Sequence, residues 1–151
     1  MKIFYLCPTG LHTALVAAGI HVGRLSPDRP PSEYEMHKLF REFRRLDYVL
    51  GKPVFVGIDE NGHEVFTVGV AAEHKMMKKA VEDVFDRVYN SKPGDYLVVD
   101  AAHLATGWIR LGSFFAMHLN IKEVGEKMCV HGIRKRYGDL LEFVEQVKNR
   151  V

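Results

Sequence analysis

The chain has 151 residues, of which 47% are hydrophobic and 26% are charged, a composition that is ordinary for a soluble globular domain. Its 21 basic and 19 acidic side chains leave a formal charge of +2, which speaks against bulk attraction to polyanions and against nucleic acid as a partner. No apolar run approaches the about 20 residues that a membrane span needs, so we expect one domain over residues 1–151 and no membrane insertion.

The first part of the chain predicts one strand and two helices. Residues 2–7 form a short apolar run that is typical of a buried strand, and after a turn the Ala-rich apolar stretch 13–25 predicts a helix covered on most sides. Ser32 and Glu35 have the spacing of a capping box, in which each side chain binds the backbone N–H of the other residue. They open an amphipathic helix over residues 33–50, because apolar residues recur there every three or four positions.

The middle of the chain predicts an antiparallel hairpin. Two β-branched runs, 54–58 and 63–70, flank the pair Asn61-Gly62, and Asn-Gly favours a tight turn because both residues tolerate positive φ. Five further elements follow: a helix over 73–89, a strand over 96–99 that ends at Asp100, a helix over 105–119, a weaker strand over 127–131 and a C-terminal helix from Tyr137.

This alternation of strands and helices predicts an α/β fold. With about five strands, we expect a three-layer α/β/α sandwich whose mostly parallel sheet is made mixed by the β-hairpin. In such sheets, ligands bind outside the carboxyl ends of the parallel strands. The residues that follow each predicted strand are therefore the candidates for a functional site.

Polar side chains gather at these positions. They are Thr9, Gly10, His12 and Thr13 after the first strand, His74 after the hairpin, Asp100 and His103 after the next strand, and Gly132, Arg134 and Lys135 after the last. We assign His12, Asp100 and His103 as candidate catalytic residues, with a histidine as acid or base and Asp100 orienting a histidine or a metal. The other seven residues are candidate ligand-binding positions.

The loop over residues 7–13 leads directly into a helix, whose free backbone N–H groups and dipole attract anions. Gly10 lets a phosphate approach the backbone, and Thr13 offers a hydroxyl. The loop is only P-loop-like, because it lacks the lysine and the earlier glycine of that motif. The alternative is a tight turn in which Thr13 simply caps the helix.

The cations at 134–136 form a second part of the predicted anion site. Arg134 and Lys135 would neutralise a phosphate or a carboxylate, since a guanidinium binds both bidentately; the alternative is a solvated turn. The histidines His12, His74 and His103 lack the close spacing of a metal site, so no metal ligand is assigned and the cofactor stays open.

Two other residues are expected to be structural or inert. His21 lies within an apolar helix, which is typical of a core histidine whose hydrogen bonds are satisfied. Cys7 is expected to be a buried, unreactive thiol. Cys7 and Cys129 are too few cysteines for a disulfide framework. We therefore expect the protein in the reducing cytoplasm.

Two segments resemble a known family: CPTGLHT at residues 7–13, with the apolar helix up to residue 25, and GIRKRY at residues 132–137. In them the chain is similar to DUF3189, an uncharacterised domain of unknown function from spore-forming bacteria. The matching positions are Gly10, His12, Thr13, Gly132 and Arg134. The resemblance covers nearly the whole chain and implies a bacterial cytoplasmic protein of one domain. It transfers no catalytic residue, because the family has no known activity.

These observations leave two functional hypotheses. In the first, the chain binds a small anionic ligand, phosphate- or nucleotide-like, at the carboxyl edge of the sheet and acts as a hydrolase or phosphotransferase. In the second, it is a non-catalytic module that binds a partner or forms a homodimer through the apolar helix that carries Trp108, Phe114 and Phe115. Whether the protein is an enzyme is left open by the sequence.

Overall fold

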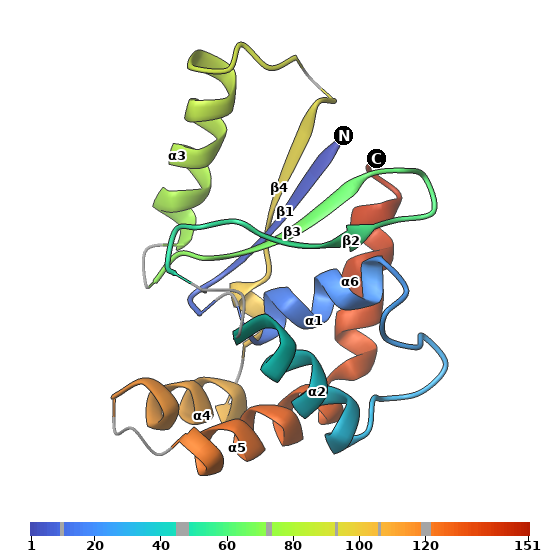
Figure 1. Cartoon of the computed structure of the whole chain (residues 1–151), viewed down its shortest axis with the longest axis vertical. Helices are drawn as coiled ribbons and strands as arrows, with labels where there is room; N and C mark the ends of the chain where they lie inside the picture. Colours follow the sequence, from blue (N-terminus) through green and yellow to red (C-terminus); the bar gives the residue numbers. More distant parts are fainter. Residues whose placement is uncertain (10, 45–48, 72–73, 93, 106, 119–121) are drawn as a thin grey trace.

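The computed structural model of the chain describes residues 1–9, 11–44, 49–71, 74–92, 94–105, 107–118 and 122–151. Within these residues, one open sheet has four strands in the order β2-β3-β1-β4 (Figure 1). The strands are β1 (Lys2–Cys7), β2 (Val54–Ile58), β3 (Glu64–Gly69) and β4 (Tyr96–Asp100). β1 pairs in parallel with β3 and β4, while β2 pairs antiparallel with β3. The prediction of a mixed sheet with one hairpin is confirmed.

The three parallel strands end level with one another. Cys7 is paired with Gly69, and Leu6 is paired with Asp100, so the carboxyl ends of β1, β3 and β4 lie along one edge of the sheet. All of β1 after Lys2 is buried, and its odd-numbered and even-numbered side chains belong to two different apolar clusters. This strand is therefore covered on both faces, as its uninterrupted apolar sequence predicts.

The β2–β3 turn forms at the Asn-Gly pair. Gly62 has a φ of +80°, in the left-handed region that glycine adopts without a Cβ clash. One carboxylate oxygen of Asp59 accepts hydrogen bonds from the backbone N–H of Asn61 at 2.9 Å and of His63 at 2.8 Å. Such Asx geometry closes the turn and fixes the register of the hairpin.

The second oxygen of Asp59 belongs to a chain of buried polar side chains. It lies 3.1 Å from His21 Nε2 and 3.0 Å from His63 Nδ1, and His21 Nδ1 lies 2.6 Å from the Tyr5 hydroxyl. The prediction that His21 is a satisfied core histidine is confirmed. Burial lowers the pKa of His21 and raises the pKa of Tyr5. At Asp59 burial favours the neutral acid, but hydrogen bonds from His63 and His21 outweigh it and keep the pKa of that carboxyl low.

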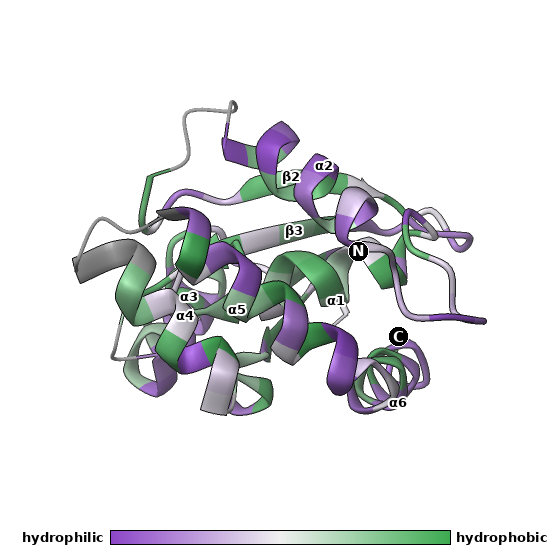
Figure 2. Cartoon of the chain, turned by 90° about the horizontal axis from the view of Figure 1, so that it is seen from below, coloured by the Kyte–Doolittle hydropathy of each residue, from purple (hydrophilic) through white to green (hydrophobic). Residues whose placement is uncertain are grey.

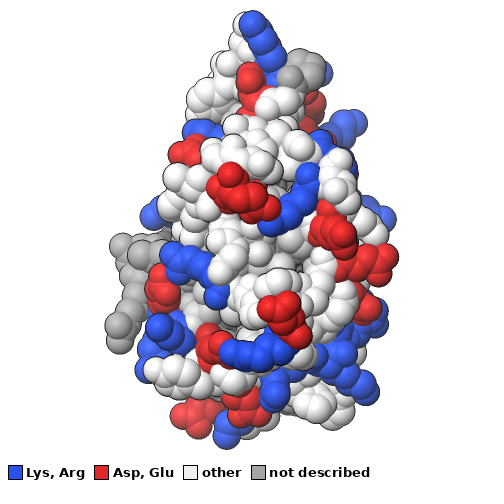
Figure 3. Space-filling view, turned by 90° about the vertical axis from the view of Figure 1, so that its right-hand side faces the viewer, with Lys and Arg blue, Asp and Glu red and all other residues white. Residues whose placement is uncertain are grey.

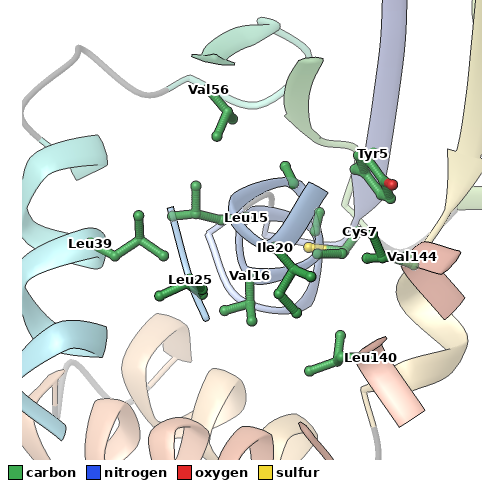
Figure 4. Close-up of a cluster of buried hydrophobic side chains, with 14 of the residues drawn as sticks. Tyr5, Cys7, Leu15, Val16, Ile20, Leu25, Leu39, Val56, Leu140 and Val144 are labelled. Atoms are coloured by element: carbon green, nitrogen blue, oxygen red, sulfur yellow. The ribbon is translucent and has the colours of Figure 1, made fainter. Parts of the chain in front are cut away.

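Helix α1 (Thr13–His21) is the centre of the larger apolar cluster, and every one of its residues is buried. The sheet, α2 (Glu33–Arg44) and α6 (Tyr137–Lys148) surround it (Figure 1). Figure 2 shows α1 hydrophobic beside α2, which carries hydrophilic residues. Figure 4 shows side chains of α1 among those of its neighbours, with Leu39 from α2, Val56 from β2, and Leu140 and Val144 from α6.

Helix α2 begins at the predicted capping box. Ser32 Oγ accepts the Glu35 N–H at 3.2 Å, and Glu35 Oε2 accepts the Ser32 N–H at 2.7 Å. Arg29 donates two further hydrogen bonds to the same carboxylate, each at 2.9 Å. The contact with Arg29 and the bonds from Ser32 lower the pKa of Glu35 to about 2. The predicted helix also included 45–48, which lie outside the described residues.

Helix α3 (His74–Arg87) packs on the opposite face of the sheet. Its inner side chains Met77, Val81 and Phe85 contact the smaller apolar cluster, which lies on that face. None of its residues is fully buried, and Met76 and Val84 are exposed on its other sides. This helix is therefore held to the molecule along one side.

The predicted strand at 127–131 is wrong, because these residues lie inside a helix, α5 (Lys122–Lys135). α5 packs against α4 (Gly107–His118), which follows β4 after the short helix η1 (Ala102–Leu104). Buried residues of α5 recur at Gly125, Cys129 and Ile133, the spacing of a helix face. The α4–α5 pair lies beyond the carboxyl edge of the sheet (Figure 1). With four strands in the described residues and this pair beyond the sheet, the five strands and the three-layer sandwich are not confirmed.

Two glycines let α4 and α5 approach closely. A Cβ added at Gly112 would lie 2.5 Å from the Gly125 carbonyl oxygen, and one at Gly132 would lie 2.7 Å from Ile109 Cγ1. Distances this short are steric clashes, so both positions require glycine for the helices to cross as they do. Gly132 thus has a packing role inside α5 and does not form a loop before a helix.

Lys, Arg, Asp and Glu side chains are interspersed over the face shown in Figure 3, without a large region of one sign. This pattern matches the small formal charge of the sequence and gives that face no extended basic surface for a polyanion. Among the residues that the structure describes, no helix combines the length and the apolar character needed to cross a membrane.

Candidate functional site

A cavity of about 240 Å³ opens at the carboxyl edge of the sheet. The loop after β1, the first turn of α1, the start of α3 and one side of α4 form its walls. Its polar lining residues are Thr9, His12, Thr13, His74, Arg110 and Ser113. At about 30 Å³ per water molecule, this volume holds about eight waters and suits a small chemical group.

The N-terminus of α1 faces this cavity through Thr13. His12 is the cap residue of α1, and its side chain makes no capping hydrogen bond. The first intrahelical bond runs from the Val16 N–H to the His12 carbonyl at 2.9 Å. The N–H groups of Thr13, Ala14 and Leu15 precede that bond, and such groups are the donors by which a helix N-terminus holds an anion.

The Thr13 hydroxyl is buried and unpaired. Only 1% of the residue is exposed, and Oγ1 finds no hydrogen-bond partner among the described residues. Thr13 is the first residue of α1, so the alternative in which it simply caps the helix is not what the structure shows. An unpaired buried hydroxyl costs roughly 1–3 kcal/mol, and this one belongs to a residue that lines the cavity.

The ring of His12 lies between two hydroxyl groups. Its Nδ1 is 3.0 Å from Thr9 Oγ1 and 3.1 Å from Ser113 Oγ. The ring also packs edge-on against Phe40 of α2, with centroids 5.5 Å apart. Burial lowers the pKa of His12 to about 4, and the charge of Arg44 adds to the effect. His12 is therefore neutral at neutral pH and is a weak proton acceptor.

His74 and Asp100 form a hydrogen-bonded pair at the cavity. His74 Nδ1 lies 2.7 Å from Asp100 Oδ2, while Asp100 Oδ1 accepts the backbone N–H of Ala102 at 2.9 Å. A carboxylate on one ring nitrogen fixes the tautomer and the orientation of a histidine. With Nδ1 donating, Nε2 is the proton-accepting nitrogen, and it makes no hydrogen bond to the described residues. The sequence had suggested that Asp100 orients a histidine, and the structure places it against His74.

His103 lies outside the cavity. It is exposed on η1, and its Nδ1 is 2.9 Å from the backbone oxygen of Asp100. Its ring meets Phe143 of α6 edge to face, with centroids 5.1 Å apart. This histidine therefore contacts Asp100, as His74 does, but it is not among the residues that line the cavity.

The cations expected at the site also lie elsewhere. Arg134 and Lys135 are exposed in the last turn of α5, and Arg134 lies 3.7 Å from Glu33 at the start of α2. Neither lines the cavity. Gly10, also expected here, lies outside the described residues.

Arg110 and Ser113 of α4 were missed by the sequence reasoning. Arg110 lines the cavity, and its Nε donates to the Ala105 carbonyl at 2.7 Å, which fixes the position of the guanidinium. The two residues are three positions apart and share one face of the helix. No local pattern marks them as site residues, because α4 reaches the cavity through a tertiary contact.

The thiols near the cavity are protected. Cys7 and Cys129 are both buried, as expected for Cys7, and burial raises the pKa of the Cys129 thiol to about 11. A thiol with a raised pKa is a poor nucleophile at neutral pH. No group of three or more potential metal-binding side chains occurs in the described part of the chain.

A family model described as "Protein of unknown function (DUF3189)" matches residues 2–149. The chain belongs to this family. The predicted resemblance to DUF3189 is thereby confirmed, whereas the origin from spore-forming bacteria and the cytoplasmic location stay predictions. No curated protein and no solved structure matches the chain. The function of this DUF3189 protein must therefore be argued from the cavity itself.

Proposed function

We propose that this DUF3189 protein binds the phosphate or carboxylate end of a small anionic molecule in the cavity at the start of α1. The observation that carries the proposal is the buried side chain of Thr13: the residue lines the cavity, and its hydroxyl has no hydrogen-bond partner among the described residues. An anionic oxygen would accept hydrogen bonds from that hydroxyl and from the first N–H groups of α1 together. Binding would thus remove the cost of the unpaired hydroxyl.

The charges around the cavity favour an anion over a cation. The positive end of the α1 dipole and the guanidinium of Arg110 meet at this place. No carboxylate is among the described residues that line the cavity. His12 adds a neutral ring, because its pKa lies near 4.

The size of the cavity narrows the ligand class. Drug-sized ligand pockets measure about 300–1,000 Å³, and this cavity measures about 240 Å³. A phosphate with a short substituent fits inside it. A nucleotide would place its phosphate at α1 and leave its base outside.

Calorimetric titration with inorganic phosphate tests the proposal. In the wild type, phosphate at 100 times its dissociation constant adds about 2.7 kcal/mol to the free energy of unfolding, which raises Tm by several degrees. Thr13→Val keeps the shape of the side chain and removes the unpaired hydroxyl. We expect this variant to be at least as stable as the wild type without phosphate and to lose most of its phosphate affinity.

Two arginine variants provide the contrast. Arg110→Ala should weaken phosphate binding about tenfold or more, since a charged hydrogen bond contributes about 1.5–3 kcal/mol. Arg134→Ala is the matched control and should bind as the wild type does, because Arg134 pairs with Glu33 away from the cavity. Equal losses in the two variants, or unchanged affinity in Thr13→Val, would contradict the proposal.

A second function is favoured by the outer side of α4. Trp108, Leu111 and Phe114 are each about half exposed, at 52%, 46% and 50%, whereas Ile109 is buried. Exposed apolar side chains grouped on one helix are typical of an interface, so self-association through α4 is the alternative function. Sedimentation of the wild type and of Leu111→Glu tests it: a dimer that Leu111→Glu converts to a monomer supports it, and a monomeric wild type rejects it.

A further inference from the structure

We infer that the cavity is catalytic and that His74, positioned by Asp100, accepts the proton from water in the hydrolysis of a phosphate monoester. This inference rests on the proposed function, because the phosphate of the substrate would occupy the anion site at the start of α1. It goes further by naming the reaction, the proton acceptor and its positioning residue.

Of the three histidines near the carboxyl edge, His74 is the one suited to carry a proton. His12 faces two hydroxyls with the same ring nitrogen, and its pKa near 4 makes it a weak base. His103 is exposed outside the cavity and bonds to a backbone oxygen. His74 lines the cavity, and its Nε2 makes no hydrogen bond to the described residues.

Asp100 is well placed to act as the positioning residue. It ends β4 in register with Leu6 of the buried strand β1, and one of its oxygens is held by the Ala102 N–H. The other oxygen lies 2.7 Å from His74 Nδ1. The carboxylate thus ties the first residue of α3 to the sheet. It keeps the proton on Nδ1, which leaves Nε2 as the acceptor.

The reaction balances with water as the co-reactant. The water oxygen forms a bond to phosphorus while the bond from phosphorus to the ester oxygen breaks, and that bonding pair leaves with the ester oxygen. His74 Nε2 takes a proton from the attacking water. The released alkoxide or phenoxide takes a proton from solvent. The α1 N–H groups, the Thr13 hydroxyl and Arg110 stabilise the charge on the oxygens of the transferred phosphoryl group. Such charge stabilisation is the main contribution of a protein to phosphoryl transfer.

The test uses p-nitrophenyl phosphate, whose phenoxide leaves without an acid. His74→Asn is the key variant, because the asparagine amide can replace Nδ1 in the bond to Asp100 while Nε2 is lost. We expect kcat to fall about 100-fold or more, the size of a general-base contribution, with KM and inhibition by phosphate changed less than about threefold. His74→Gln, which lacks the Asp100 contact, is the second variant and should lose kcat equally.

Two further variants separate positioning from proton transfer. Asp100→Asn should lower kcat by up to about 10⁴-fold with KM unchanged, since the ring would remain but its tautomer would no longer be fixed. His103→Gln is the matched control on the other side of Asp100 and should keep the wild-type kcat. Added imidazole should restore part of the activity of His74→Ala, which a purely structural role for His74 would not allow.

The outcomes distinguish the two proposals. A wild type that binds inorganic phosphate but hydrolyses no p-nitrophenyl phosphate would overturn the catalytic inference and leave the anion site standing. Wild-type kcat in a folded His74→Asn variant would do the same. Failure of the wild type to bind phosphate would overturn both.

Discussion

Helices α1 and α3 both begin at the carboxyl edge of the sheet, yet all nine residues of α1 are buried and none of α3 is. α1 packs against α2 and α6, and it is apolar between Thr13 at its start and His21 at its end. α3 touches the sheet along one side and presents charged pairs such as Lys78–Glu82 to solvent. The cavity lies between the two helix starts.

This difference indicates how the candidate site is organised. Thr13 is held by the core, so the half of the site that we propose binds an anion would be fixed before a ligand arrives. His74 begins a helix that is held on one side, and its bond to Asp100 ties it to the sheet. We therefore expect the Asp100 contact, more than the packing of α3, to set the position of His74.

The largest expected effect comes from truncating the core of α1. Leu15 is fully buried, so Leu15→Ala should lower the free energy of unfolding by about 4 kcal/mol through lost burial and a residual cavity. Met77→Ala on α3 is the matched variant and should cost about 1 kcal/mol, because Met77 is partly exposed. Urea unfolding measures both. Equal losses would show that the two helices are held alike.

The second prediction concerns pH. The pKa of His12 is lowered to about 4 in the fold, while an unfolded histidine has a pKa of about 6.5. As pH falls below about 6.5, the unfolded chain binds a proton at His12 while the folded chain does not. The free energy of unfolding is therefore at its full value above pH about 6.5 and decreases as pH falls toward 4. The expected loss is about 3 kcal/mol, and the lowered pKa of His21 acts in the same direction.

Urea midpoints at pH 7.5, 6 and 5 measure this loss. His12→Asn should flatten the profile, because it removes the titrating ring that faces Thr9 and Ser113. A wild-type midpoint that stays constant from pH 7.5 to 5 would show that α1 is not closed to water as described.

The third prediction asks whether the α4–α5 pair is packed as tightly as α1. Gly132→Ala places a Cβ 2.7 Å from Ile109 Cγ1, and overpacking of this kind costs about 2 kcal/mol. Phosphate affinity should stay within about twofold, since Gly132 does not line the cavity. If Gly132→Ala is as stable as the wild type but loses phosphate affinity, Gly132 contributes to the ligand site, as the sequence predicts, and not to helix packing.

The smallest expected effect is at the start of α2, the helix that packs on α1. Ser32→Ala removes one half of the capping box of α2, which should cost about 1 kcal/mol. Amide hydrogen exchange should then rise along α2 and stay slow in α1. If amide exchange also became faster throughout α1, α2 would protect that helix from exchange more than the sheet and α6 do.

The sequence predicted the elements that local patterns specify. The capping box at Ser32 and the turn at Gly62 formed as expected, because their hydrogen bonds and φ depend on neighbouring residues. The apolar run 127–131 was misassigned, since a short apolar run has no periodicity that separates a strand from a buried helix.

The same misassignment misplaced part of the site. Arg134 and Lys135 were expected at the cavity because a strand was expected before them, whereas α5 carries them away from it. Thr13 and His74 do line the cavity, because the strands that precede them were assigned correctly. Arg110 was missed because the approach of α4 to the sheet edge is a tertiary contact that no local pattern encodes.

The most direct test of the proposed anion site is an NMR titration of ¹⁵N-labelled protein with inorganic phosphate. We predict saturable shifts that are largest at the amides of Thr13, Ala14 and Leu15 and at Arg110 Nε, with Arg134 unmoved. Shifts centred on Arg134 and Lys135, or weak shifts without saturation, would contradict an anion site at the start of α1.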